Sequence, residues 1–118
     1  MGKVRVVRGA DHEALPWTET PRPEGDTNPP GEEVTSFKSG DGQFMVGLWR
    51  RVPETGPMAL DDYHEVALIL EGDVEVTDED GSVHRAGPGD LLITPKGTKA
   101  TWHALTPIKK VWMIYTGD

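Results

Sequence analysis

The chain has 118 residues, of which 12 are basic and 20 acidic, giving a formal net charge of −8, and it contains no cysteine. This length suits one domain with a single modest core. The lack of cysteine excludes a disulfide framework and a thiolate metal site. Because binding to nucleic acid depends on basic side chains that contact phosphates, the acidic balance argues against a nucleic-acid partner.

No segment approaches the roughly 20 consecutive apolar residues that a membrane-spanning helix requires. Residues 1–10 carry positive charge, but they lack the apolar region and the cleavage-site pattern of a secretory signal. We therefore expect a cytoplasmic protein without a membrane partner.

The prolines divide the chain into two parts. We expect residues 1–31 to form an N-terminal strand and a proline-rich arm, and residues 32–118 to form the main domain. Within the first part, Lys3–Arg8 is predicted to be an edge strand, because its three valines are available for burial.

Five prolines between Asp11 and Gly31 exclude a regular helix there. They favour an extended arm that wraps the domain or crosses to a partner, and the alternative is a mobile leader. Trp17 favours docking, since an indole ring is a large apolar surface to leave in water.

Short runs of strand-forming residues, separated by turn residues, cover the rest of the chain. Val111–Tyr115 is apolar on both faces, so we expect it at the centre of a sheet. Glu65–Glu71 and Val74–Thr77 are joined at Gly72 and Asp73, which suggests a hairpin. Val52–Pro57 is interpreted as a break. The other expected strands are Glu33–Lys38, Gln43–Arg51, Ser82–Arg85, Leu91–Thr94 and Ala100–Leu105. Eight or nine strands and no convincing helix are typical of an all-β sandwich or jelly-roll barrel.

Two spacings in the middle of the chain match the motifs of a known family. Glu65 is followed after six residues by Gly72, which resembles the second half of the first cupin motif. A second spacing resembles the first half of the second cupin motif: Gly89 is followed after five residues by Pro95, and Pro95 after one residue by Gly97. This resemblance implies the all-β cupin fold, a double-stranded β-helix or jelly-roll barrel in a single domain.

A narrower resemblance rests on the segment Gly87–Trp102 and on the lysine at position 110. Both are similar to the small RmlC-like cupins related to the (S)-ureidoglycine aminohydrolase cupin domain. The likeness extends over Gly47–Tyr115. By analogy of fold, it implies a role in nitrogen-compound or amino-acid metabolism.

The usual cupin metal centre needs histidines that this sequence lacks. In most cupins a His-x-His pair lies three or four residues before the motif glutamate, and a third histidine lies in the second motif. By this resemblance, the corresponding positions are Ala59 and Asp61, or Met58 and Leu60, and Ala100. We therefore expect no metal cofactor.

The alternative is a divalent transition metal held by Glu65 together with Asp61 or a shifted histidine, His64 or His103. Successive residues of a strand point to opposite faces, so His64, next to Glu65, is expected to point out of the barrel. The same alternation turns His103 outward. A β-bulge could reverse either orientation.

Even without a metal, the inward face predicts a ligand pocket. Glu65 offers a carboxylate and Trp102 an aromatic wall, which suits a small polar or cationic molecule. Lys110 matches the lysine of the similar cupins and is expected to pair with Glu65 or to hold a substrate carboxylate. Trp49 corresponds to that family's tryptophan before the first motif, and Tyr63 lies at the expected mouth. The alternative is a purely structural Glu65–Lys110 ion pair with Trp102 in the core.

Three functions are consistent with this pattern. The first is a cupin that binds a small amine or carboxylate metabolite without a metal, as an enzyme or as a binding protein, with no residue assigned a catalytic role. The second is a metal-dependent hydrolase or lyase built on Glu65. The third is a non-catalytic dimeric interaction module.

Outward-facing apolar stripes predict a homodimer. In a lone small barrel such stripes would be exposed, so they require cover from the second sheet, the N-terminal arm or a twin subunit. Resemblance to dimeric cupins makes the twin subunit the simplest choice. The two stripes are His64, Val66, Leu68 and Leu70, and Val111, Met113 and Tyr115.

Overall fold

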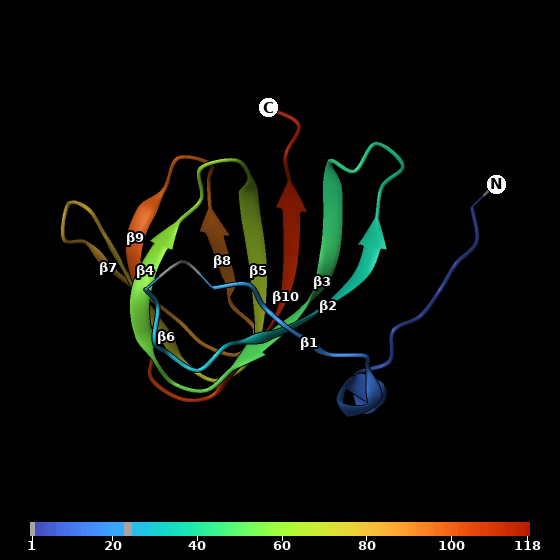
Figure 1. The fold of residues 1–118 in the computed structure, drawn as a ribbon, viewed down its shortest axis with the longest axis horizontal. Helices are drawn as coiled ribbons and strands as arrows, with labels where there is room; N and C mark the ends of the chain where they lie inside the picture. The colour runs from blue at the N-terminus through green and yellow to red at the C-terminus, as the bar shows by residue number, and fades with distance from the viewer. Residues whose placement is uncertain (1, 23–24) are drawn as a thin grey trace.

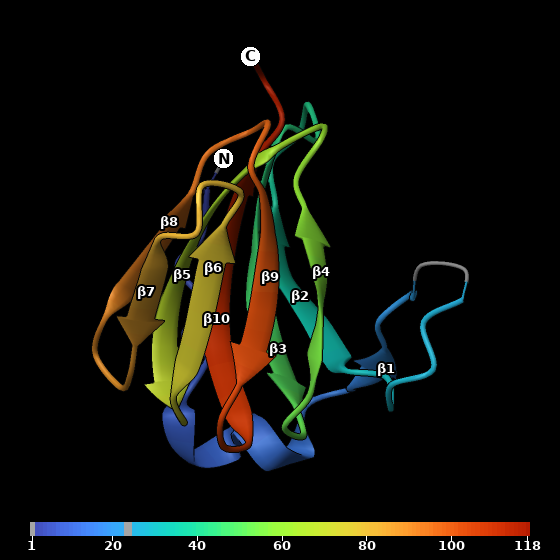
Figure 2. The same cartoon turned by 90° about the vertical axis from the view of Figure 1, so that its left-hand side faces the viewer.

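Two antiparallel sheets pack face to face in the computed structural model, which describes residues 2–22 and 25–118 (Figures 1 and 2). Among these residues, one sheet has six strands in the order β1-β2-β3-β10-β5-β8, and the other has four in the order β4-β9-β6-β7. The predicted all-β jelly-roll barrel is confirmed. The elements are the 3-10 helix η1 (Gly9–Ala14) and the strands β1 (Thr18–Glu19), β2 (Glu32–Lys38), β3 (Phe44–Arg51), β4 (Thr55–Ala59), β5 (His64–Glu71), β6 (Val74–Asp78), β7 (Val83–Ala86), β8 (Leu91–Thr94), β9 (Lys99–Ala104) and β10 (Ile108–Tyr115).

Strand β10 lies at the centre of the larger sheet, between β3 and β5, as its apolar sequence predicted. Lys110 and Trp112 on this strand are buried and face the second sheet, whereas Val111 and Met113 point outward. Gly47 on β3 lies opposite Trp112, and a Cβ there would come within 2.4 Å of the indole ring. Glycine at this position therefore makes room for the ring.

The core lies between the sheets, at the end where β5 passes into β6. Ile69, Val74 and Ile108 are its largest fully buried side chains. At this corner Gly72 has a φ of 89°, and a Cβ would lie 2.1 Å from the Pro107 carbonyl oxygen, so only glycine fits.

The hairpin predicted at this corner is wrong. β5 pairs with β10 and β8, whereas β6 pairs with β7 and β9. The turn at Gly72 and Asp73 therefore carries the chain from one sheet to the other, and its residues suit such a corner as well as they suit a hairpin.

The strand predicted at Lys3–Arg8 is also wrong. The segment is extended, but it pairs with no strand of the described residues, and Val4 is 94% exposed. Arg5 donates a side-chain hydrogen bond to the Ser36 carbonyl, which holds the segment beside β2. Its valines find no apolar surface there, and strand propensity alone does not form a ladder.

The break interpreted at Val52–Pro57 contains the start of β4, which pairs with β9 along its whole length. Pro57 is tolerated because β4 is an edge strand. A residue there can face away from the sheet, so the missing N–H donor costs no hydrogen bond of the ladder. The arm is likewise more regular than expected, since η1 precedes its first proline and β1 pairs with β2.

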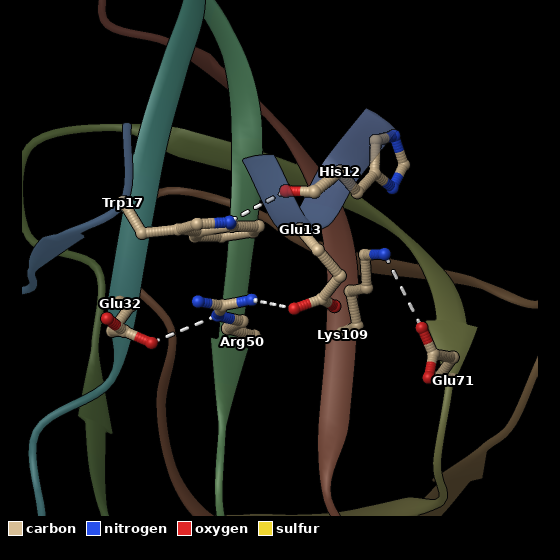
Figure 3. Close-up of polar contacts among 7 residues, drawn as sticks. All are labelled: His12, Glu13, Trp17, Glu32, Arg50, Glu71 and Lys109. Atoms are coloured by element: carbon tan, nitrogen blue, oxygen red, sulfur yellow. Dashed lines mark hydrogen bonds and ion pairs between the residues drawn. The ribbon is translucent and has the colours of Figure 1, made fainter. Parts of the chain in front are cut away.

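Trp17 fastens the arm to the outer face of β3 (Figure 3). Its indole N–H donates a 2.8 Å hydrogen bond to the His12 carbonyl, and the Arg50 guanidinium lies 4.0 Å from the centre of the ring. Arg50 also forms 3.0 Å ion pairs with Glu13 and Glu32. The arm is therefore docked, as Trp17 predicted. We call the cluster of Trp17, Arg50, Glu13 and Glu32 the arm latch.

Candidate ligand pocket

A buried ion pair occupies the inward face of the larger sheet. Lys110 Nζ on β10 donates a 3.0 Å hydrogen bond to Glu65 Oε2 on β5, and both side chains are 10% exposed. Lys110 is in register with Ile69, so its long side chain runs along the sheet toward Glu65. Ala67 lies between Glu65 and Ile69 on the same face, and its small side chain leaves space for the pair.

Two tryptophans from opposite sheets enclose the ammonium group. The rings of Trp49 on β3 and Trp102 on β9 meet edge to face, with centroids 5.7 Å apart and an interplanar angle of 85°. Lys110 Nζ lies 4.9 Å from the first centroid and 5.1 Å from the second. The lysine side chain therefore lies between the Glu65 carboxylate and two indole rings, in one polar and aromatic cluster.

Two adjoining cavities, of about 270 Å³ and 300 Å³, open onto this cation. The first extends toward Trp102 and β4, and the second toward Trp112 and β2. The structure thus brings together all the ligand-binding residues predicted from the sequence, with Trp102 lining the first cavity only. The side chains that line both are Thr20, Trp49, Tyr63, Glu65 and Lys110.

The mouth of the pocket is acidic. Burial raises the pKa of Tyr63, and the negative charges of Glu65 and Asp61 raise this pKa further, followed by those of Asp62 and Glu33. The phenol therefore stays protonated at neutral pH and can donate a hydrogen bond. The same carboxylates make the entrance attractive to cations and to N–H donors.

Sequence reasoning missed Thr20, which reaches the pocket from the arm. The Thr20 amide donates to the Gly31 carbonyl, and a Cβ on Gly31 would come within 2.6 Å of Trp49 Nε1. Glycine here lets the arm lie against the indole. No periodic pattern marks a residue of an irregular arm as part of a pocket, so the sequence holds no signal for Thr20.

Arg51 and Glu54 support the pocket from behind Trp102. Arg51 lines the first cavity, and its Nε lies 3.6 Å from the Glu54 carboxylate. Burial raises the pKa of Glu54, against the opposing charge of Arg51. Arg51 shares the inward parity of Trp49 on β3, which is a signal that the sequence did contain.

The residues of the alternative metal site do not converge. His64 Nε2 lies 2.6 Å from an Asp118 carboxylate oxygen, and His64 Nδ1 accepts a hydrogen bond from the Lys96 amide. His103 is exposed on β9, in the other sheet. Across residues 2–22 and 25–118, no group of three or more His, Asp and Glu is placed to hold a metal ion.

Two facing antiparallel sheets with a pocket between them, entered beside the first-motif glutamate, define the chain as a cupin. The family model of the EutQ-like cupin domain matches residues 30–112. The chain therefore belongs to the EutQ-like cupin family.

Solved structures support this fold. The EutQ protein of Clostridium difficile is similar, with 19% sequence identity and a TM-score of 0.68 over 80% of this chain and 68% of that one. A predicted oxalate decarboxylase from Thermotoga maritima has 16% identity and a TM-score of 0.71 over 95% and 99% of the two chains. A DUF861 family protein from the same organism is 37% identical over 55% of this chain and 73% of its own, with a TM-score of 0.53.

None of the curated proteins compared with the chain matches it. The narrower resemblance to (S)-ureidoglycine aminohydrolase cupins and the cytoplasmic location both stay predictions. In the part of the chain that the structure describes, no helix has the length and apolar character needed to cross a membrane.

Proposed function

We propose that this cupin binds a small metabolite rich in N–H donors, an amine or an amide, in the barrel pocket without a histidine-based metal centre. The observation that carries the proposal is the Glu65–Lys110 pair held between Trp49 and Trp102 at the wall of two small cavities. Such a protein would serve nitrogen-compound or amino-acid metabolism as a binding protein or an enzyme.

The polar groups of the pocket favour an N–H donor over a carboxylate. Lys110 bonds to Glu65 Oε2, which leaves Glu65 Oε1 to accept a hydrogen bond from a ligand. The negative charges around Tyr63 disfavour an anion at the entrance. Lys110 is already neutralised by Glu65, so a ligand carboxylate would have to displace that partner.

The apolar groups limit the size of the ligand. Cavities of about 270 Å³ and 300 Å³ lie at the lower end of the range for small-molecule sites. The rings of Trp49 and Trp102 provide flat apolar walls on which a short carbon skeleton packs. These features together suit a metabolite of a few heavy atoms.

Titration with four small probes tests the proposal. We expect glycinamide and acetamide at millimolar concentration to raise the melting temperature, glycine to raise it less, and acetate to leave it unchanged. A carboxylate hydrogen bond to a charged donor contributes about 1.5–3 kcal/mol, so Glu65→Gln should weaken glycinamide binding about tenfold or more.

Glu75→Gln is the matched control, because Glu75 lies on β6 and pairs with the exposed Arg85. The affinity of Glu75→Gln for glycinamide should equal that of the wild type. Unchanged affinity in Glu65→Gln would remove Glu65 from the site, and stabilisation by acetate alone would reverse the preferred ligand class. No response to any probe would favour the purely structural ion pair.

A further inference from the structure

The proline-rich arm crosses from one sheet to the other beside the ligand pocket (Figure 1). On one side, its strand β1 pairs with β2 and extends the larger sheet. On the other side, the Asn28 side-chain amide donates a 3.1 Å hydrogen bond to the Thr55 carbonyl at the start of β4, the edge strand of the smaller sheet. Arg51 on β3 also holds the arm, because its Nε donates a 3.0 Å hydrogen bond to the Pro29 carbonyl. The arm therefore forms a wall of the barrel.

Thr20 is the residue of this wall that lines both cavities. Its backbone amide donates a 2.9 Å hydrogen bond to the Gly31 carbonyl, and Gly31 lies against the Trp49 indole. The hydroxyl oxygen of Thr20 is buried and has no hydrogen-bond partner within residues 2–22 and 25–118. A buried hydroxyl without a partner destabilises the folded chain, so native structures seldom keep one without another use for it. This hydroxyl is therefore free to bind a ligand.

Two further polar groups of the first cavity are in the same state. Arg51 Nη2 and Trp102 Nε1 are buried, and neither forms a hydrogen bond with the residues that the structure describes. An Asp26 carboxylate oxygen lies 3.7 Å from Arg51 Nη2, and Glu54 Oε1 lies 3.6 Å from Arg51 Nε, both beyond hydrogen-bonding reach. A guanidinium and an indole N–H are donors only. This side of the pocket thus favours a ligand that brings an acceptor oxygen.

We propose that Thr20 determines the specificity of the pocket, because its hydroxyl donates a hydrogen bond to a carbonyl oxygen of the ligand while Glu65 accepts one from the ligand's N–H. The inference rests on the binding of an N–H donor proposed above, and it narrows the ligand class from amines and amides to amides. An amide carries a carbonyl oxygen and N–H groups on one carbon, so it matches both residues, which line the same two cavities. A simple amine offers no acceptor to Thr20.

Because Thr20 belongs to the arm, ligand binding and arm docking are linked. An amide bound to Thr20 stabilises the docked arm, and the docked arm raises the affinity for the amide by the same factor. Glu19 precedes Thr20 and pairs with Glu32 in the ladder between β1 and β2. Acetamide should therefore slow cleavage by Glu-C protease after Glu19.

NMR titration of the full chain with acetamide and isopropylamine tests the proposal. The two probes are similar in size, but isopropylamine has a methyl group where acetamide has its carbonyl oxygen. Thr20→Val keeps the volume of the side chain and removes the hydroxyl. We expect Thr20→Val to weaken acetamide binding about threefold to tenfold and to leave isopropylamine binding unchanged. Thr20→Ser keeps the hydroxyl and should retain the affinity for acetamide.

Thr18→Val is the matched control. Thr18 lies on the same arm and its hydroxyl donates to the Glu33 carbonyl, but it lines neither cavity. Thr18→Val should bind acetamide as the wild type does. Acetamide should protect the bond after Glu19 equally in the wild type and in Thr18→Val, and should protect it less in Thr20→Val.

Two results would separate a failure of this inference from a failure of the proposed function. If Thr20→Val weakens neither probe, or weakens both equally, Thr20 does not bind the carbonyl oxygen, and only this inference is overturned. If neither probe binds to the wild type, the proposed function fails and this inference fails with it. Circular dichroism melts show that each variant is folded before its affinity is compared.

Discussion

On β10, Lys110 points into the barrel and its neighbour Val111 points away from it. β5 repeats the arrangement with Glu65 beside Val66. In a half-buried antiparallel sheet the usual order is apolar inside and polar outside. Here the mouth of the barrel holds a charged pair at 10% exposure, while the outward rows are aliphatic and reach 66% exposure. Both faces of one sheet therefore depart from the usual order, with charged side chains inside and exposed aliphatic side chains outside.

Removing one partner of the inward pair should have the largest effect. Lys110→Met leaves the Glu65 carboxylate buried without its partner, so we expect a loss of about 3 kcal/mol in the free energy of unfolding. Val111→Thr, at the adjacent outward-facing position, should lower the free energy of unfolding by less than half of this amount. Urea denaturation of both variants measures the difference.

The double variant Glu65→Leu/Lys110→Met sharpens this comparison. Replacing both charges by apolar side chains of similar volume should restore most of the stability, because no unpaired charge remains. The double variant should nevertheless fail to respond to glycinamide. If it binds the probe as the wild type does, the pair is structural only.

A substitution in the arm latch should have a smaller effect on stability, because the latch covers only one end of the outer face of the larger sheet. Arg50→Ala removes two ion pairs and the stacking on Trp17, together about 1 kcal/mol. We expect native-state cleavage by Glu-C protease after Glu13 to become about fivefold faster. Arg85→Ala, which removes a more exposed ion pair, is the control. Equal rates in the two variants would contradict the latch.

The smallest expected effect concerns Glu54, a buried carboxylate whose ion pair with Arg51 is long, at 3.6 Å. Burial raises the pKa of Glu54 above its ordinary 4.5, so the folded state holds this proton more tightly than the unfolded state. Stability from this group is complete below the ordinary pKa and is lost as the pH rises through the raised pKa. Glu54→Gln should therefore show a smaller fall in melting temperature from pH 4 to pH 7.

Asp41 provides a control of opposite sign. A hydrogen bond from Ser39 lowers the pKa of this exposed carboxyl, so its contribution is present at neutral pH and lost as the pH falls. Asp41→Asn should thus change the acid side of the melting profile. Parallel profiles for Glu54→Gln and the wild type would show that Glu54 does not titrate differently on folding.

The sequence was informative wherever a local pattern decides the structure. Alternation located most strands, the two cupin spacings identified the fold, and the parity of Glu65, Trp102 and Lys110 brought the central pocket residues together. The corner at Gly72 was misread, because a glycine turn within a sheet and one between sheets use the same residues. β4 was missed because Pro57 suggests a break unless the strand is known to be an edge.

Contacts that depend on the tertiary path had no local signal. Thr20 reaches the pocket only because the arm crosses the barrel after the latch. The valines of Lys3–Arg8 have strand propensity, but propensity does not show whether a partner strand is free to receive them. Tertiary packing decides whether Thr20 lines the pocket and whether Lys3–Arg8 pairs as a strand.

The paired indoles beside Lys110 also have an optical consequence. Two rings 5.7 Å apart and nearly perpendicular couple their electronic transitions, and a nearby ammonium shifts their emission. A molecule entering the cavities would disturb both signals without any added dye. The protein thus carries its own spectroscopic reporter at the place where a ligand is proposed to bind, distinct from Trp17 on the surface.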